Sequence, residues 1–372
     1  MTVFRLIALL PFIVSALTGC ANLKPTAQLP EGFAVRELAK ADAGAPFAVN
    51  HSGRFAAISK GMLQIIDAQG IALDITEGTA TALCFSPSGE KLAAALPTAS
   101  QTLLRLFDRR GKVLAEATTP ERVTSMAWRS ESQLLATTLG IRKLASGWEL
   151  TARLYSWDGS SPPVATTLST VTLESPPAAL PEQTLLRTLS LAVSPYGDEI
   201  AYSSLQDQQI FAPYQKITVR QLESGAEREV GKTSVGSGGP LYTPDGDSLL
   251  VGDEHALTRR LSIPDGREMD AWPSPGSYPA LSSSGAYTFL DGCLYRDGRT
   301  VLSFPAQSRG VFLPDGSGLA ISCDGKLYLI SGLKDQTKPR SPAELERLLK
   351  LRRLRSLGLI SEKEYSAQKA GH

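Results

Sequence analysis

Few residues of this chain have the types and spacing that chemistry at a site requires. The three histidines, His51, His255 and His372, are far apart in the sequence, and neither a GxSxG nor an HExxH motif occurs. Residues 225–233 approach the pattern of a phosphate-binding loop, but five residues separate the glycines where four are required. We therefore predict no catalytic residue, no metal and no cofactor, and we expect that the protein is not an enzyme.

The four cysteines are the other reactive side chains, and one of them stands apart. Cys20 follows an apolar N-terminal run, whereas Cys84, Cys293 and Cys323 lie in later apolar segments. No CxxC pair occurs, so a zinc site is not expected. The three later thiols fit buried apolar positions in strands, although a disulfide between two of them, such as Cys293 and Cys323, stays open.

The N-terminal residues have the pattern of an export signal. Arg5 precedes a largely apolar run of twelve residues, 6–17, and a bilayer-spanning helix would need about 20. The residues Leu17, Thr18, Gly19 and Cys20 then resemble the lipobox of bacterial lipoproteins. The resemblance implies that residues 1–19 are a signal peptide and that Cys20 becomes an acylated N-terminus. Several acyl chains hold a domain at a membrane more firmly than one chain can.

The lipoprotein resemblance also implies a location. Residues 20–32 would be a lipidated N-terminus and linker, with Asn22 rather than Asp two places after the cysteine. In Gram-negative lipoproteins that choice implies the outer membrane, so we expect a cell-envelope protein that faces the periplasm. An ordinary secreted protein is the alternative.

A nine-residue unit recurs seven times between positions 49 and 320. Each copy has an apolar residue, a turn with Pro or Ser followed in six copies by Gly, and an apolar restart. Pro fixes φ near −65° early in such a turn and Gly supplies the left-handed conformation near its end, so the chain reverses between antiparallel strands. The copies are Val49–Ala57, Phe85–Ala93, Trp128–Ala136, Val193–Ala201, Tyr242–Leu250, Leu281–Phe289 and Phe312–Ala320.

The spacing of the copies predicts a β-propeller. Gly53 and Gly316, the fifth residues of the first and last copies, enclose six intervals that average about 44 residues. A four-stranded propeller blade takes roughly 40–45 residues in the best-known repeat class. Between copies, apolar strands such as 62–67 and 103–108 end on an Asp and then a Gly-containing turn, which suits a tight hairpin.

These turns resemble those of WD-repeat and TolB-like propellers over residues 33–332. The WD dipeptide itself occurs once, at Trp157-Asp158, and the Gly-His pair of strict WD repeats is missing. Only one further strand, 326–331, follows the last copy, so we expect 33–38 to complete that blade and hide both edges. The expected fold is all-β, a seven-bladed propeller of four-stranded antiparallel blades with a small α-helical hairpin after it. Six or eight blades are the alternatives.

The C-terminal residues predict that hairpin. Ser341, Pro342 and Glu344 have the types of a helix start, Gly358 can end the helix, and Ser361 begins a second one. Two short helices cannot bury a leucine stripe alone, so it must meet the propeller, a second copy or another protein. The stripe contains Leu345, Leu348, Leu349, Leu351, Leu354 and Leu357.

The run from Leu354 to Tyr365 resembles SHOCT, a short C-terminal module, with residues 333–340 as a linker and 341–372 as the module. The resemblance implies docking or oligomerisation. Packing on its own propeller and docking to another chain are both open. The arginines between the leucines are expected to form a solvated face, or else to contact anionic headgroups.

Two insertions, 138–150 and 172–184, are further candidate partner surfaces, because long loops are often functional. With a net charge of only +1, nucleic acid is not an expected partner. We predict a membrane-anchored protein-interaction scaffold whose partner is an envelope protein or a second copy. The alternatives are a sensor that binds a small ligand or envelope polymer in the propeller channel and, third, a hydrolase. The expected partner surface comprises Leu345, Leu348, Leu349, Leu354 and Trp148.

Overall fold

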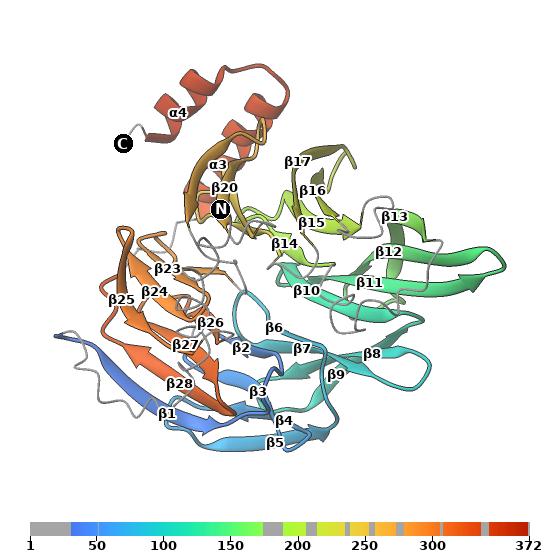
Figure 1. Ribbon diagram of the computed structural model, residues 1–372, viewed down its shortest axis with the longest axis vertical. Helices are drawn as coiled ribbons and strands as arrows, with labels where there is room; N and C mark the ends of the chain where they lie inside the picture. Colours follow the sequence, from blue (N-terminus) through green and yellow to red (C-terminus); the bar gives the residue numbers. More distant parts are fainter. Residues whose placement is uncertain are drawn as a thin grey trace, which may run out of the picture.

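The computed structural model describes residues 31–370 except 51, 174–188, 206–213, 235–238, 253–256, 273–278, 306–307 and 336–341. Seven four-stranded antiparallel sheets surround a common axis as the blades of a propeller (Figure 1). The expected blade number and strand number are confirmed.

The first four blades follow the chain from their inner to their outer strand. They are blade 1 with β2 (Phe47–Val49), β3 (Phe55–Ser59), β4 (Met62–Ile66) and β5 (Ala72–Glu77); blade 2 with β6 (Ala82–Phe85), β7 (Lys91–Pro97), β8 (Thr102–Asp108) and β9 (Val113–Thr119); blade 3 with β10 (Arg122–Ser130), β11 (Gln133–Leu144), β12 (Gly147–Trp157) and β13 (Val164–Leu173); and blade 4 with β14 (Leu191–Val193), β15 (Glu199–Leu205), β16 (Tyr214–Gln221) and β17 (Glu227–Ser234).

The last three blades complete the ring. They are blade 5 with β18 (Leu241–Tyr242), β19 (Ser248–Gly252), β20 (Thr258–Ser262) and β21 (Glu268–Trp272); blade 6 with β22 (Ala280–Leu281), β23 (Tyr287–Leu290), β24 (Cys293–Arg296) and β25 (Arg299–Ser303); and blade 7 with β26 (Arg309–Phe312), β27 (Gly318–Cys323), β28 (Lys326–Ser331) and β1 (Ala34–Lys40).

Strand β1 closes the ring as the outer strand of blade 7. It pairs antiparallel with β28, from Ala34 opposite Ser331 to Lys40 opposite Lys326. The expected pairing of the first and last segments is thereby confirmed. The core lies between neighbouring blades, as where Ile58 and Leu63 of blade 1 share a buried cluster with Leu92 of blade 2.

The recurring turn has the conformation that its residues predict. All six of its glycines have φ between +69° and +79°, and each N–H donates to the carbonyl three residues earlier. Gly89 N–H, for example, donates to Ser86 O at 2.8 Å. We call the connection between the third and fourth strands of a blade its third turn. The third turn of blade 1 is equally regular, because Asp67 Oδ1 accepts hydrogen bonds from the N–H groups of Gln69 and Ile71.

The insertion 138–150 is regular structure rather than a loop. Strands β11 and β12 pair without interruption from Leu134 opposite Trp157 to Leu144 opposite Gly147. The extra residues therefore lengthen one hairpin of blade 3. Residues 134–139 of β11 are buried and residues 141–143 are exposed, so the tip of the hairpin extends beyond the core. The other insertion begins in β13, and its remainder lies outside the described residues.

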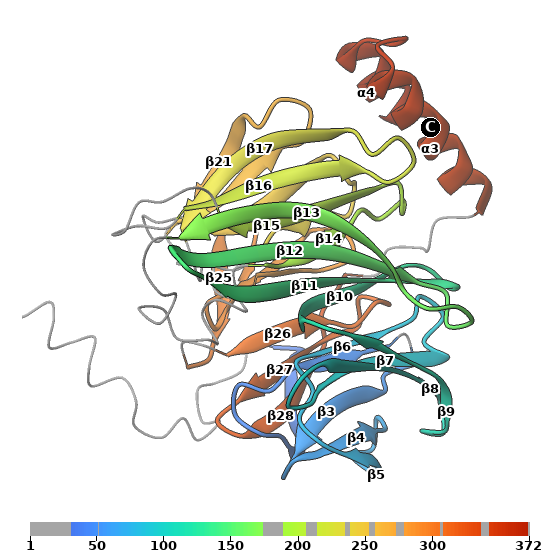
Figure 2. The same cartoon turned by 90° about the vertical axis from the view of Figure 1, so that its right-hand side faces the viewer.

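The strand order divides the propeller into two faces. The connections from first to second strand and from third to fourth strand emerge on one side, which we call the turn face. The helices α3 (Pro342–Ser356) and α4 (Glu362–Ala370) lie beside it (Figure 2). No helix in the described part of the chain is long and apolar enough to cross a bilayer.

Local capping sets the shape of the helical hairpin. Gly358, at φ +68°, ends α3, and the N–H of Leu359 donates to Leu354 O at 2.9 Å, as in a Schellman motif. Ser361 and Glu364 then form a capping box, in which Glu364 N–H donates to Ser361 Oγ and Glu364 Oε2 accepts from Ser361 N–H. The second predicted cap is present, whereas Ser341 lies outside the described residues.

Candidate interaction site between the helical hairpin and blades 4 and 5

The site is built on the recurring turns of blades 4 and 5. In each turn an aspartate follows the turn glycine, Asp198 after Gly197 and Asp247 after Gly246. Hydrogen bonds fix the carboxylates, since Ser194 Oγ donates to Asp198 Oδ1 at 2.5 Å. In the recurring turn of blade 5, Asp245 Oδ1 accepts a hydrogen bond from Asp247 N–H at 3.1 Å. Two neighbouring turns thus present acids on the turn face.

Arg352 of α3 inserts into this acidic surface and is only 4% exposed. Its Nε lies 3.0 Å from Asp198 Oδ2 and its Nη2 lies 3.0 Å from Glu199 Oε2. Its Nη1 donates to the carbonyl of Gly246 at 2.9 Å and lies 3.4 Å from Asp247 Oδ1. One guanidinium therefore joins the C-terminal helix to both blades, and its fork geometry suits this use.

A second group of contacts surrounds Asp247. Its Oδ1 accepts a hydrogen bond from Tyr365 OH at 3.0 Å and lies 3.3 Å from Arg355 Nη1, while Lys369 also pairs with it. Tyr365 is buried, and the Arg355 guanidinium lies 4.0 Å from its ring centroid. Both helices of the hairpin therefore reach the same carboxylate.

Burial shapes the electrostatics of this ionic cluster. Desolvation raises the pKa of the Glu199 carboxyl above its usual range, although Arg352 and Arg228 oppose the shift. Burial lowers the pKa of Arg352, but Asp198 and Glu199 outweigh it, so the net pKa is raised. Removing one member of such a cluster leaves a buried charge uncompensated, which costs about 3–5 kcal/mol.

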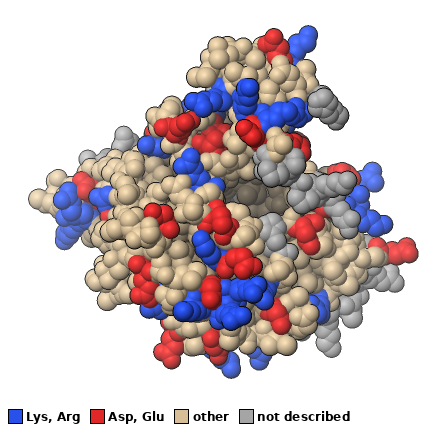
Figure 3. Space-filling model, turned by 180° about the vertical axis from the view of Figure 1, so that it is seen from behind, with Lys and Arg blue, Asp and Glu red and all other residues tan. Residues whose placement is uncertain are grey.

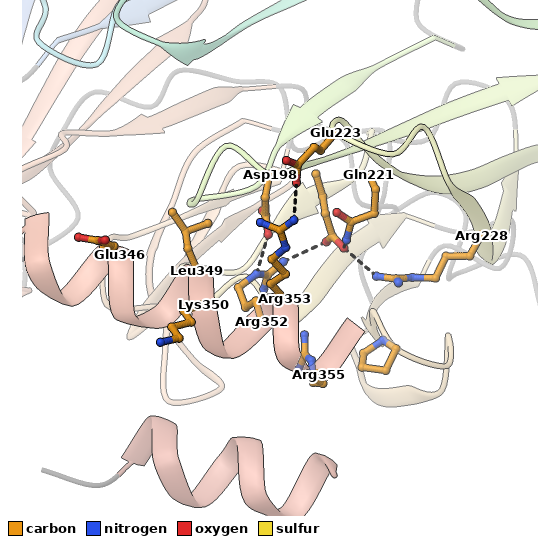
Figure 4. A pocket seen from close by; sticks show the side chains of 12 residues that line it. Asp198, Gln221, Glu223, Arg228, Glu346, Leu349, Lys350, Arg352, Arg353 and Arg355 are labelled. Atoms are coloured by element: carbon orange, nitrogen blue, oxygen red, sulfur yellow. Dashed lines mark hydrogen bonds and ion pairs between the residues drawn. The ribbon is translucent and has the colours of Figure 1, made fainter. Parts of the chain in front are cut away.

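An open groove of about 660 Å³ runs between α3 and the turns of blades 4 and 5. Figure 4 shows charged side chains from both walls around it, and Figure 3 shows acidic and basic atoms gathered where the hairpin meets the propeller. Because both signs of charge are present, the groove suits a partner that carries both. Its lining residues are Asp198, Glu199, Gln221, Glu223, Arg228, Pro264, Glu346, Leu349, Lys350, Arg352, Arg353 and Arg355.

The predicted leucine surface is only partly at this site. Leu348 is buried, Leu349 lines the groove, and Leu354 is half-buried, whereas the side chain of Leu345 lies outside the description. Trp148 lies elsewhere, on β12, where it packs half-buried in a cluster with Leu150 of the same strand. The structure does not bring these predicted residues together in one surface.

The expectation that the arginines form a solvated face is wrong for Arg352. The side chain of its neighbour Arg353 is 70% exposed, but Arg352 is buried against three carboxylates. In the described chain the hairpin docks on its own propeller, which is one of the two alternatives left open by the sequence. A sequence signal existed, because only the copies in blades 4 and 5 have Asp directly after the turn glycine.

The remaining candidates give no second site. Residues Leu17, Thr18, Gly19 and Cys20 lie outside the described residues. Cys84, Cys293 and Cys323 are free thiols, and burial raises the pKa of Cys84 to about 12. Within the described ranges, no three His, Cys, Asp or Glu side chains are placed to hold a metal ion.

The comparisons with known proteins define the class of fold. The propeller domain of Swd1 from Myceliophteria thermophila aligns with a TM-score of 0.54 and 17% identity, covering 80% of this chain and 99% of that one. A chain of a mitotic checkpoint complex aligns with a TM-score of 0.54 and 13% identity, covering 80% and 93%. No family model and no curated protein matches the sequence. The chain thus has the fold of a seven-bladed propeller, while the WD-repeat, lipoprotein and SHOCT resemblances stay predictions.

Proposed function

We propose that the protein is an interaction scaffold anchored to a membrane of the cell envelope through Cys20. The observation that carries this proposal is the ionic cluster around Arg352, which fixes α3 against blades 4 and 5 beside an open groove. A fixed groove is a preorganised binding surface, so little ordering is needed when a partner binds. The second similar propeller belongs to a mitotic checkpoint complex, which supports a role within an assembly.

The partner that fits the groove is a protein segment with charges of both signs. Lys350 and Glu346 are exposed on the helical wall, and Glu223 faces them from the third turn of blade 4. Such rim charges act mainly on association rate and specificity. Reversing the groove cations should therefore reduce partner recovery without unfolding the propeller.

Affinity purification after crosslinking in the envelope tests this binding site. The groove variant is Lys350→Glu with Arg353→Glu, and the matched control is Lys363→Glu on α4, which does not line the groove. We expect a stoichiometric partner with the wild type and the control, and at least a tenfold loss with the groove variant. Equal recovery with all three would refute the groove as the binding site.

The anchor has its own test. Mass spectrometry of the mature chain should show an N-terminal, acylated Cys20, and Cys20→Ser should move the protein from the membrane fraction to the soluble one. A mature chain that retains residues 1–19, or a Cys20 without acyl chains, would refute the anchor.

A further inference from the structure

Exposed apolar side chains gather at one rim of blades 1 to 3. Ile71 and Val164 are 69% and 68% exposed, although both are large and apolar. Each follows the third turn of its blade and so lies at the turn face, near the start of the outer strand. We call the group the apolar rim; it comprises Ile71, Leu73, Val113, Leu114 and Val164.

The blades that carry the apolar rim adjoin one another through their third turns. A Cβ added at Gly111, in the third turn of blade 2, would lie 3.1 Å from Ile75 on β5. A Cβ added at Gly159, in the third turn of blade 3, would lie 3.1 Å from Leu106 and 3.8 Å from Ala115 on β9. The third turn of each blade therefore touches the outer part of the blade before it. Five exposed large apolar side chains on three adjoining blades mark an interaction surface more than one such residue alone does.

A basic turn lies within the apolar rim. Arg109, Arg110 and Lys112 are exposed in the third turn of blade 2. The one carboxylate of that turn, Asp108, accepts hydrogen bonds from the backbone N–H groups of Arg110 and Lys112 at 2.8 and 2.9 Å. Glu90 lies 3.8 Å from Arg109, so three cations accompany two acids, Asp108 and Glu90. Apolar side chains beside cations match the acyl boundary and headgroups of an anionic bilayer.

The described chain begins at the same face. The backbones of Gly32 and Gly332 are so close that a side chain at 332 would collide with the Gly32 carbonyl, which places the start of β1 at the turn face. Twelve residues lie between Cys20 and Phe33, and an extended chain over these thirteen residue steps spans at most about 45 Å. An acylated Cys20 would therefore keep the turn face within reach of the membrane.

We infer that the apolar rim and the basic turn of blades 1 to 3 form a docking surface for an anionic lipid bilayer. The inference rests on the proposed membrane anchor, which brings the surface to the bilayer. Docking would tilt the ring so that the blade 1 to 3 side of its turn face meets the headgroups, away from the groove beside blades 4 and 5. The opposite face would then point into the aqueous compartment.

The tip of the long hairpin of blade 3 provides a matched control. Ile141 is 41% exposed there and is followed by the exposed cations Arg142 and Lys143, so its residue types repeat those of the docking surface. The tip joins the second and third strands and thus lies on the opposite face. Lipid contact through the turn face predicts that this tip has no effect.

Vesicle sedimentation of the Cys20→Ser chain, which carries no acyl group, tests the docking surface. The rim variants are Ile71→Asn with Leu114→Asn, and Arg109→Glu with Arg110→Glu; the controls are Ile141→Asn and Arg142→Glu with Lys143→Glu. On vesicles of phosphatidylglycerol and phosphatidylethanolamine, we expect each rim variant to bind at least tenfold more weakly than the control variants. Binding should also fall when salt is raised from 0.1 to 0.5 M.

Equal binding by rim and tip variants, or no binding by the Cys20→Ser chain, would overturn the docking surface. Rim variants that lose a crosslinked protein partner while the chain ignores vesicles would assign the surface to that protein instead. The anchor is tested separately by the mass of the mature chain. Failure of acylation with intact rim-dependent vesicle binding would refute the anchor alone.

Discussion

The recurring turns of blades 2 and 4 have the same backbone but different uses. Gly89 and Gly197 have φ of +74° and +69°, and each donates its N–H to the residue three before it. After Gly89 come Glu90 and the cation Lys91, whereas Asp198 and the buried Glu199 follow Gly197. The glycine fixes the reversal of the chain, and the two residues after it decide whether the turn faces solvent or holds the hairpin.

Of the substitutions below, Arg352→Met should weaken the docking of the hairpin on blades 4 and 5 most. It leaves Glu199 buried with the Arg228 pair at 3.1 Å and a hydrogen bond from Gln221, and it removes the contacts with Asp198 and Asp247. We expect the docked hairpin to lose about 3 kcal/mol relative to the detached one, since a broken buried pair is costly. Hydrogen exchange of α3 measures this. Unchanged protection would show that the leucines, not the arginine, hold the hairpin.

Gly246→Ala separates turn strain from docking. The left-handed backbone conformation at this position costs an alanine about 1–2 kcal/mol of stability. The alanine Cβ would also lie 2.7 Å from Tyr196 and 2.9 Å from Arg352 Nη1. Gly285→Ala in blade 6 has similar strain at φ +79°, but its Cβ would lie no nearer than 3.8 Å to any other group. Urea unfolding should show that Gly246→Ala and Gly285→Ala lower the free energy of unfolding by similar amounts, within about 1 kcal/mol of each other. Proteolysis of the hairpin should rise only for Gly246→Ala; equal rises would contradict the account.

The pH dependence of docking has two opposite parts. Desolvation raises the pKa of the Glu199 carboxyl in the folded state above its usual value of about 4.5. The ionisation of Glu199 therefore weakens the docked state as the pH rises through this raised pKa. Burial alone would raise the pKa of Asp245, but hydrogen bonds from Thr243 and Asp247 and the charge of Lys369 lower it, so its contribution is lost as pH falls below about 3.8. Hydrogen exchange, corrected for intrinsic rates, should show α3 more protected at pH 5 than at pH 7, and less protected at pH 3 than at pH 5. Glu199→Gln should abolish any difference between pH 5 and 7.

Arg353→Met should have the smallest effect. Its side chain is 70% exposed and lies 3.9 Å from Glu223, whose side chain is 78% exposed. Exposed pairs contribute about 0–1 kcal/mol, so we expect less than about 0.5 kcal/mol by the same exchange measurement. A loss as large as that of Arg352→Met would remove the contrast between the two neighbouring arginines.

The sequence was most informative where a local rule repeats. The Gly turns, the Asp67 hairpin and the Ser361 cap each depend on neighbouring residues, so the propeller and the hairpin could be predicted. Docking depends on residues 105 to 154 positions apart, such as Asp247 or Asp198 with Arg352. Helical periodicity marks apolar stripes, and it therefore assigned Arg352 to solvent. The blade-specific Asp after the turn glycine would have been the better guide.

The central claim is that Arg352 holds the hairpin on blades 4 and 5 of its own chain. Hydrogen exchange of α3 in the full chain, at 1 and 100 µM, for wild type, Arg352→Met, Asp247→Asn and the double variant tests it most directly. We predict equal protection at both concentrations and a double variant that loses clearly less than the sum of the single losses, by about 1 kcal/mol or more. Additive losses, or protection that appears only at 100 µM, would contradict the claim.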